Sequence, residues 1–394
     1  MVGTFDVANF GDLLFPVLAK RALKLRGVEE GLELFSLRGA PAFAAPTFSS
    51  FSVRAIQEFP PTLPEMRGLI VGGGDLIRFD PLVVHGYGGD GILPFPECLW
   101  LLPALVAVRC GIPVVWNSPG VVGAIPHWAV PFVAELVAGS AYVSVRDKFS
   151  QRSLKTAVGE TVQIHVVPDS AFGLEPRQKQ LQKGHDGQFD VLVHASVAVA
   201  RTLRMDTFLL RKLRRLRVAL VEVGTALGDD VLRLAALLPA AEHVRYSGVP
   251  DLLEVLENSR SVISSSLHLT IGASAAEREV MHFAHPRVRK HCIILNIRNE
   301  QNEAAREFSF GRNALSSNSV PKSIRVSVAG HWDAIVAVLG AERQQRTGPV
   351  CALDIWNDTC DEINRARKTD EPAQRLSLVT RALSYRRPER IVLT

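Results

Sequence analysis

The sequence lacks the features that mark several common protein classes. Its five cysteines, in 394 residues, are scattered, and none forms a CxxC pair. An odd and scattered set argues against a disulfide framework and a zinc site, and favours a reducing compartment. No GxxxxGK[ST] phosphate loop occurs, and the run Gly72-Gly73-Gly74 lacks GxGxxG spacing. That run is therefore not a dinucleotide fingerprint, and a nucleoside-triphosphate loop is not expected.

Neither a signal peptide nor a membrane span is expected. The chain has no cationic start followed by an apolar run and a cleavage site. Residues 111–134 contain no Asp, Glu, Lys or Arg, which is long enough to cross a bilayer, but four prolines interrupt them. Such a segment does not form a lipid-exposed helix. We therefore expect a soluble protein that works in the cytoplasm.

Charge of either sign is not in large excess. The net charge is +5 with a pI near 9.0, too little for a dedicated nucleic-acid binder. One run, from Arg211 to Arg217, concentrates five cations. Such a run is usually a solvated face, but it also suits an anionic membrane surface or another polyanion. No aromatic residue interrupts the run, so binding to single-stranded nucleic acid is not expected.

What the sequence does contain is a repeated pattern of apolar strand, Gly- or Asp-bearing loop and amphipathic helix. Strands that are apolar on both faces and alternate with helices predict parallel sheets covered on both sides. The expected strands cover residues 69–71, 112–116, 142–145, 164–167, 189–193, 218–223, 243–246, 261–264 and 292–297. Only Met1 to Phe5 precede the first loop, so the first strand is very short or the chain begins inside it.

A polar stretch from Glu175 to Gln188 separates two series of strands and is interpreted as a linker. The predicted fold class is α/β, with two Rossmann-like, doubly wound domains facing across a cleft and helices at the C-terminus. We assign residues 1–178 to an N-terminal domain and 189–345 to a C-terminal domain. Residues 346–394 form the helical extension.

Two loops near the N-terminus carry glycine and acidic residues. Asn9, Gly11 and Asp12 open the first amphipathic helix, where they either cap it or help to bind a ligand at the carboxyl end of a strand. Gly72-Gly73-Gly74-Asp75 follows a strand. Its glycines allow close approach of backbone to a ligand or to a neighbouring loop.

Two further segments carry chemically useful side chains. Ser264-Ser265-Ser266-Leu267-His268 joins a strand to a helix of small residues. A histidine in the first turn suits acid–base chemistry or anion binding, although a structural histidine is the commoner outcome. Arg146 and Asp147 also follow a strand, where an arginine either pairs with its neighbour or grips a carboxylate or phosphate.

In this order, these motifs resemble the polysaccharide pyruvyl transferase family over most of residues 1–275. The motifs are Asn9-Phe10-Gly11-Asp12, Val71-Gly72-Gly73-Gly74-Asp75, Val143-Ser144-Val145-Arg146-Asp147, Val167-Pro168-Asp169 and Ser264-Ser265-Ser266-Leu267-His268. The resemblance implies a fold like that of the GT-B glycosyltransferases. It also implies transfer of a carboxyethylidene group from phosphoenolpyruvate to a sugar of an exopolysaccharide or cell-surface glycan precursor, without a metal or other cofactor.

The resemblance implies site roles, with the domain of residues 1–178 on the acceptor side of the cleft and that of residues 189–345 on the donor side. His268 and Asp12 are the expected catalytic residues. The donor would be bound by Arg146, Ser265, Ser266 and Arg298, and the acceptor by Asn9, Gly11, Gly73, Gly74 and Asp75. Two positions depart from the family pattern: Ser266 stands where many members have arginine, and Arg298 is the candidate for a lysine that is otherwise missing.

Two other functions stay open. One is a GT-B glycosyltransferase that uses a nucleotide sugar, with Glu277 or Glu279 as the carboxylate that grips the ribose. The other is a catalytically silent glycan-binding homologue. The expected partners are a small-molecule donor and a glycan or lipid-linked oligosaccharide acceptor, with peripheral contact at the inner membrane face through residues 211–217 and no nucleic acid.

Overall fold

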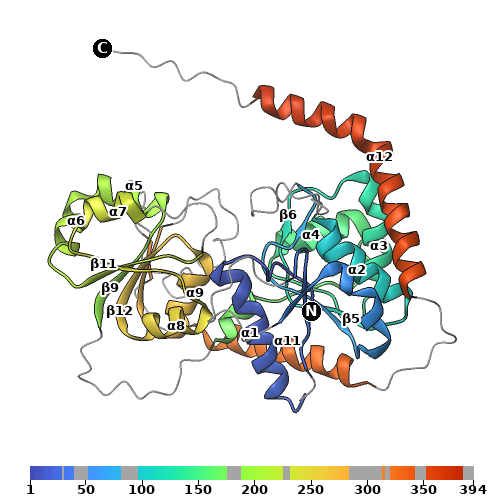
Figure 1. Cartoon of the computed structure of the whole chain (residues 1–394), viewed down its shortest axis with the longest axis horizontal. Coiled ribbons are helices and arrows are strands. Elements are labelled where there is room, and N and C mark those ends of the chain that lie inside the picture. Colours follow the sequence, from blue (N-terminus) through green and yellow to red (C-terminus); the bar gives the residue numbers. More distant parts are fainter. Residues whose placement is uncertain are drawn as a thin grey trace.

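The computed structural model describes residues 1–28, 31–39, 52–80, 96–174, 188–224, 231–283, 313–315, 320–341 and 352–384. Two sheets separated along the chain organise them into two lobes joined near α1 (Phe10–Lys24) (Figure 1). In the described part of the chain, no helix has the length and apolar content needed to cross a membrane.

The first sheet is built from short parallel ladders joined by single bridges. β1 (Leu34–Ser36) pairs with β2 (Val53–Ala55), and β3 (Leu69–Val71) pairs with β5 (Val114–Trp116). Val2 bridges both Phe35 and Val71, so the N-terminal segment lies between β1 and β3. On the far side, Tyr142 bridges Val115 and leads into β7 (Ser144–Val145), which pairs with β8 (His165–Val166).

The order β2, β1, N-terminal segment, β3, β5, β7, β8 is that of a Rossmann-like sheet with its switch point beside the N-terminus. Between these strands run α2 (Glu97–Arg109), α3 (Val130–Gly139) and α4 (Lys148–Val158). α2 is apolar over nearly its whole length and is buried from Leu99 to Ala107. A smaller parallel pair, β4 (Ile77–Arg78) and β6 (Val121–Val122), extends beyond β3 and β5.

The second sheet has six strands in the order β11, β10, β9, β12, β13, β14. They are β9 (Phe189–His194), β10 (Val218–Val221), β11 (Glu242–Val244), β12 (Ser259–Ser264), β13 (Glu279–His282) and β14 (Asn313–Leu315). All pairs are parallel except β13 with β14. The helices are α5 (Val197–Met205), α6 (Thr207–Leu213), α7 (Val231–Leu237), α8 (Val249–Glu257) and α9 (Leu267–Ala275).

The predicted fold class is confirmed: both sheets are Rossmann-like and parallel, apart from the antiparallel pair of β13 and β14. Six strands were not predicted: β1, β2, β4, β6, β13 and β14. β4 and β6 have only two residues each, and each of the other four contains a polar residue, so none carries a clear apolar run. The linker predicted at 175–188, the strand predicted at 292–297 and Arg298 lie, apart from residue 188, outside the described residues.

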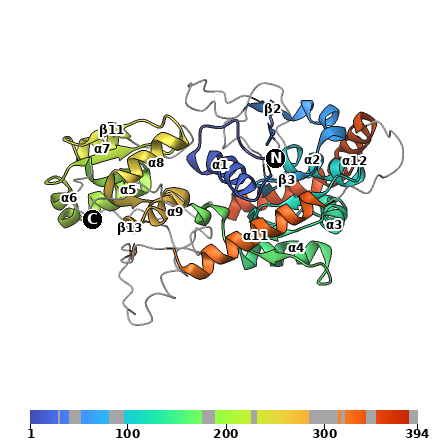
Figure 2. The ribbon, with the colours of Figure 1, turned by 90° about the horizontal axis from the view of Figure 1, so that it is seen from below.

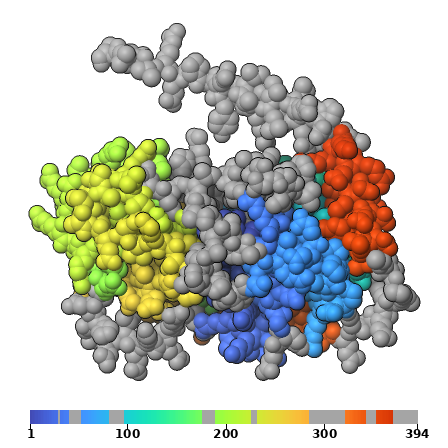
Figure 3. All heavy atoms as spheres, in the orientation of Figure 1, coloured from blue at the N-terminus to red at the C-terminus, as the bar shows by residue number. Residues whose placement is uncertain are grey.

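The last two helices return to the first domain, as Figures 2 and 3 show. α11 (Lys322–Gly340) packs against α1 and the short 3-10 helix η6 (Ser170–Gly173), and His331 of α11 bonds to Asn117 and Tyr142. α12 (Ala352–Ser384) lies on α2. The domain boundaries remain predictions; α11, which they assign to the second domain, contacts residues of the first.

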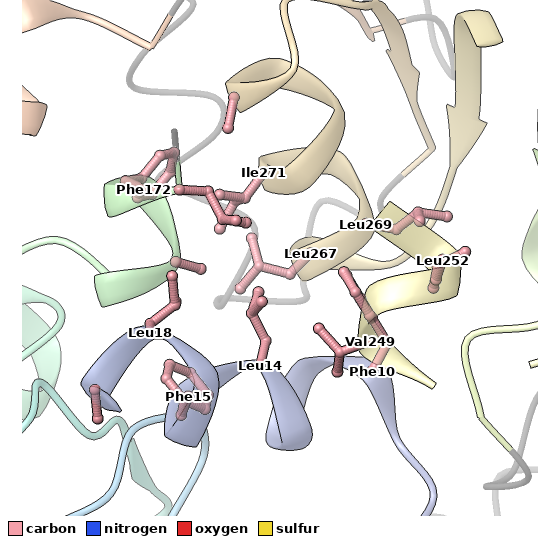
Figure 4. Close-up of a cluster of buried hydrophobic side chains, with 14 of the residues drawn as sticks. Phe10, Leu14, Phe15, Leu18, Phe172, Val249, Leu252, Leu267, Leu269 and Ile271 are labelled. Atoms are coloured by element: carbon pink, nitrogen blue, oxygen red, sulfur yellow. The ribbon is translucent and has the colours of Figure 1, made fainter. Parts of the chain in front are cut away.

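Helix α1 joins the two domains through an apolar face. Figure 4 shows its buried residues Phe10 and Leu14 directed toward α8 and α9, and Leu18 directed toward the η6 segment that carries Phe172. The facing side chains are Val249, Leu252, Leu267, Leu269 and Ile271, all in the same buried cluster. The contact arises because α1 is apolar on the face that its own sheet does not cover. It sets the beginnings of α1 and α9 against each other, where the predicted site residues lie.

Candidate functional site

A carboxylate from the first domain meets an imidazole from the second. Asp169, at the start of η6, lies with Oδ2 3.4 Å from Nε2 of His268, in the first turn of α9. Asp169 is 1% exposed and His268 15% exposed. The edge of the Phe15 ring packs against the imidazole, with the ring centroids 5.3 Å apart. The structure thus places His268 at the contact between the domains, oriented by a buried carboxylate.

Asp169 is held as an anion. Burial by itself would raise the pKa of its carboxyl, but His268 and Arg146 and a hydrogen bond from the Ala171 amide outweigh burial and leave that pKa below its usual value. The Ala171 amide donates to Oδ1 at 2.9 Å. The second oxygen is left to face His268, so the carboxylate can stabilise a protonated imidazole.

Arg146 contributes a buried positive charge near the same carboxylate. It follows β7 and is 9% exposed, and its terminal nitrogen Nη2 donates a hydrogen bond to Asp75. Its Nε lies 3.6 Å from Asp147 and makes no hydrogen bond. A β-carbon at residue 120 would collide with the guanidinium, so glycine there makes room for it. The unsatisfied Nε leaves capacity for one further anionic oxygen.

The first loop bridges the domains. Asn9 caps α1, with Oδ1 accepting a hydrogen bond from the Gly11 amide at 2.9 Å. The Phe10 amide donates to the carbonyl of Val223 at 2.7 Å, and Asn9 forms an antiparallel bridge with Gly224. The capping role is therefore real, and the loop also attaches to the end of β10. Asp12, half-buried, lies close enough to help raise the pKa of Tyr246, after burial of that phenol.

The glycine run after β3 packs against neighbouring protein. A β-carbon at residue 72 would lie 2.7 Å from the Val2 carbonyl oxygen, and one at residue 73 would lie 2.4 Å from the Phe15 ring. Gly74 has a φ of 81°, which favours glycine, and lies close to Asp12. Close packing thus accounts for all three glycines, while Asp75, beside them, pairs with Arg146.

The serines before α9 are fixed by hydrogen bonds. Ser264 Oγ accepts from the Ser266 amide at 2.9 Å, and Ser266 caps α9 by accepting from the Leu269 amide. Ser265 is held by His194, whose Nδ1 lies 3.1 Å from its Oγ and 3.4 Å from its amide nitrogen. Because the amide can only donate, Nδ1 acts there as the acceptor.

Two histidines and a serine were missed by sequence reasoning. His194, at the end of β9, and Ser196, 2.7 Å from Ser265 through its hydroxyl, are both buried. His282, at the end of β13, bonds to Thr270, and burial with the nearby His194 lowers its pKa to about 4. A signal existed for His194 and Ser196, since His194 is the last residue of β9 and Ser196 is the cap of the helix that follows it. Asp169 belongs to one of the family motifs, but the sequence did not predict a role for it.

The predicted residues do not all meet. Gly11, His268, Arg146, Asp75 and Asp12 gather near the junction, whereas Arg298 cannot be placed. Glu277 and Glu279 are exposed at the start of β13. Since β12 and β13 are parallel, that is the opposite edge of the sheet from Ser264 to His268, which speaks against either glutamate as a ligand for a donor there.

Among the described residues, this junction is neither a metal site nor part of the cavity at the amino ends of the first-domain strands. Within the described ranges no three His, Cys, Asp or Glu side chains gather as metal ligands. A cavity of about 290 Å³ lies elsewhere, between Met1, Leu23, Arg67 and Leu339, near the amino ends of the first-domain strands. The arrangement around His268 is suited instead to proton transfer and to binding an anion.

The comparisons with known proteins show weak similarities to solved structures and a clear match to one family model. No curated protein is similar enough to count as a relative. Among solved structures, a UDP-GlcNAc 2-epimerase from Methanocaldococcus jannaschii is 10% identical, over 87% of this chain and 95% of its own, with a TM-score of 0.42. MurG of Acinetobacter baumannii is 10% identical, over 91% of this chain and 97% of its own, with a TM-score of 0.35. An uncharacterised Klebsiella pneumoniae protein is 13% identical, over 73% of this chain and 84% of its own, with a TM-score of 0.35.

These structural similarities are too weak to support an argument about function. The model of the family described as polysaccharide pyruvyl transferase, in contrast, matches residues 9–286. That range extends from the cap of α1 past the end of β13 and includes Asp75, Arg146, Asp169 and His268. This chain therefore belongs to the polysaccharide pyruvyl transferase family.

Proposed function

We propose that this protein transfers a carboxyethylidene group from phosphoenolpyruvate to two hydroxyls of a sugar in an exopolysaccharide or cell-surface glycan precursor. The observation that carries the proposal is the pair of Asp169 and His268, 3.4 Å apart at the domain junction, with Arg146 near the same carboxylate. A proton donor and a buried cation are what this donor requires, and family membership agrees.

The donor is bound by charge. Phosphoenolpyruvate carries a carboxylate and a phosphate, so its site needs cations and amide donors. Arg146 is the first candidate, because its Nε is buried without a hydrogen bond. Ser265 and Ser266, at the start of α9, supply hydroxyls beside the positive end of a helix. Arg298 stays a candidate as a second cation.

The reaction requires a proton at the enol carbon. His268 donates it to C3 of phosphoenolpyruvate, which becomes a methyl group, and C2 becomes electrophilic. One sugar hydroxyl adds to C2 and loses its proton. Phosphate then leaves with the electrons of its C–O bond, and a second hydroxyl closes the ketal and loses its proton. Asp169 stabilises the protonated imidazole before the first step.

The acceptor lies on the first-domain side. Asn9, Gly11, Gly73, Gly74 and Asp75 remain the proposed acceptor-binding residues, with Asp12 orienting or deprotonating a sugar hydroxyl. Asp12 is partly exposed and close to Gly74, so it can reach a sugar over the glycine run. Asp75 has a second role, since its ion pair with Arg146 must loosen for the guanidinium to bind the donor.

The deciding assay measures phosphate release from phosphoenolpyruvate with a panel of simple β-galactosides and mannosides. We expect release with at least one acceptor and a ketal in the product. The His268→Ala variant should lose this activity, and full activity in that variant would remove His268 from the role. We propose that no metal or other cofactor takes part, so a chelator should leave the rate unchanged.

The two alternatives make different predictions. A nucleotide-sugar glycosyltransferase would be stabilised against heat by UDP- or GDP-sugars and not by phosphoenolpyruvate, and that result would refute pyruvyl transfer. A silent glycan-binding homologue would bind sugar without releasing phosphate. The exposed position of Glu277 and Glu279, at the far edge of the sheet, makes the first alternative weaker.

We propose that the enzyme works in the cytoplasm, at the inner face of the membrane, on a lipid-linked oligosaccharide. A lipid-linked acceptor cannot leave the bilayer, so an enzyme that uses it gains from a peripheral contact.

A further inference from the structure

We infer that α5, α6 and the turn after them form the surface that holds this protein to an anionic lipid bilayer. This inference rests on the proposed function only for its purpose; the surface itself is defined by charge and exposure. Residues 201–217 contain seven Lys and Arg and one Asp. Figure 1 shows α6 at the end of the second domain that lies farthest from the first.

The cations point outward. α5 buries Val199, Ala200 and Leu203, and α6 buries Leu210 and Leu213, which leaves the basic residues on the other face. The exposed cations are Arg201, Arg204, Arg211, Lys212, Arg214, Arg215 and Arg217. Two of them also bind protein: Arg217 pairs with Asp190, and Arg214 donates to the Leu237 carbonyl.

The one acid in this surface does little to offset that charge. Asp206 ends α5 and caps α6, with its Oδ1 accepting a hydrogen bond from the Leu209 amide at 3.0 Å. Its carboxylate is therefore directed at the start of a helix, where negative charge is favourable. The outer face keeps a strongly positive potential, which attracts anionic lipid over about a Debye length.

Large apolar side chains lie among these cations. Met205 is 82% exposed, Phe208 68% and Leu216 44%. Lys212 lies one turn after Phe208, with its Nζ 5.8 Å from the ring centroid. Exposure of Met and Phe side chains to water is unfavourable, whereas their burial at the boundary between head groups and acyl chains is favourable. The neighbouring cations can then bind the lipid phosphates.

This combination favours a bilayer over a nucleic acid. A single-stranded nucleic acid offers phosphates but binds best to a groove with several stacking aromatics, and Phe208 is the one aromatic residue between 201 and 217. A bilayer uses both kinds of side chain together. Figures 1 and 2 show α6 away from the place where α1 meets α9, so binding lipid there leaves the proposed active site open.

The test is co-sedimentation of the full chain with phosphatidylcholine vesicles, with or without about a third of phosphatidylglycerol. Neither phosphoenolpyruvate nor acceptor is present, so failure of the proposed reaction does not affect the outcome. We expect binding to the anionic vesicles alone, weakening as salt is added.

Three double variants separate the contributions. Arg211→Glu with Lys212→Glu should lower the partition coefficient about tenfold or more, since two cations become anions. Met205→Ser with Phe208→Ser should lower the partition coefficient but leave its dependence on salt unchanged. Lys148→Glu with Arg152→Glu changes the same charge on exposed residues of α4 in the first domain and should bind as the unchanged protein does.

Several outcomes would overturn the inference. They are equal binding to neutral and anionic vesicles, binding that salt does not weaken, and full binding by the charge-reversed variant. Binding to heparin or RNA without binding to vesicles would assign the surface to another polyanion. All substituted positions are solvent-exposed, and an unchanged melting temperature confirms that each variant is folded.

Discussion

Gly11 and His268 are in contact across the domain junction: a β-carbon built on residue 11 would lie 2.1 Å from Nδ1 of the imidazole. No side chain other than hydrogen fits between α1 and α9 at this point. The first turn of α1 therefore packs directly against the His268 ring. Phe15 also contacts this ring, and Asp169 lies beside its other nitrogen, Nε2.

The variant Gly11→Ala tests this contact. The added methyl must displace His268 from Asp169, so we expect kcat for phosphate release to fall about 100-fold, because small displacements of a reacting group are costly. Gly330→Ala is the matched control: it lies in α11 with open space around it. It should stabilise the protein by about 0.5–1 kcal/mol and leave the rate unchanged. Equal rates for the two variants would contradict the proposed geometry.

Asp169→Asn keeps the shape of the side chain and removes its charge. We expect kcat to fall about 100-fold, because the protonated imidazole loses its counter-charge, while the KM for acceptor changes little. Steady-state kinetics at several pH values measure both. An Asn variant with the rate of the unchanged enzyme would show that Asp169 only supports the fold.

The same carboxylate makes a prediction about acid stability. The folded pKa of Asp169 lies below its ordinary value of 3.8. The group therefore contributes stability above pH 3.8, and this contribution is lost as pH falls through the lowered pKa. Chemical unfolding of the parent protein and Asp169→Asn across that range should show a smaller loss on acidification in the variant. Parallel curves would contradict it.

His194 offers a test of how Ser265 is held. In asparagine the amide oxygen lies near the position of Nδ1, and in glutamine it lies near that of Nε2. His194→Asn should therefore keep the bond from the Ser265 amide, and His194→Gln should lose it. We expect the KM for phosphoenolpyruvate to rise about tenfold in the Gln variant alone, matching the loss of one such bond. An equal rise in both variants would point to general damage.

His331 predicts a second pH dependence. Burial lowers its folded pKa to about 3, from 6.5. The unfolded chain therefore binds this proton first, and stability falls as pH drops below 6.5. Between pH 6.5 and 4.5 the loss should be on the order of 2 kcal/mol for this residue. Unfolding free energies of the parent and His331→Asn should differ in slope over that range, and identical slopes would refute the assignment.

Much of the fold could be predicted from local pattern. Strands such as β3 and β10 are apolar on both faces and are followed by glycine or acidic residues, which indicates a parallel sheet whatever the rest of the chain does. Strands β1 and β2 could not be predicted, because a polar residue interrupts each short apolar run and both depend on pairing with distant segments. The packing of α11 against the first domain could not be predicted either, because His331 of this helix bonds to Asn117, more than 200 residues away.

The candidate site divides in the same way. The sequence by itself determined which residues can do chemistry: a histidine at a helix start, an arginine and an aspartate at strand ends, and glycines where backbone must approach closely. Only the tertiary structure decided that Asp169 faces His268, that Asp75 neutralises Arg146, and that Gly11 is needed for His268. Those contacts join residues from 71 to 257 positions apart, and no local pattern encodes them, because they depend on how β3 and β7 lie in the first sheet and on how α1 packs across the two domains.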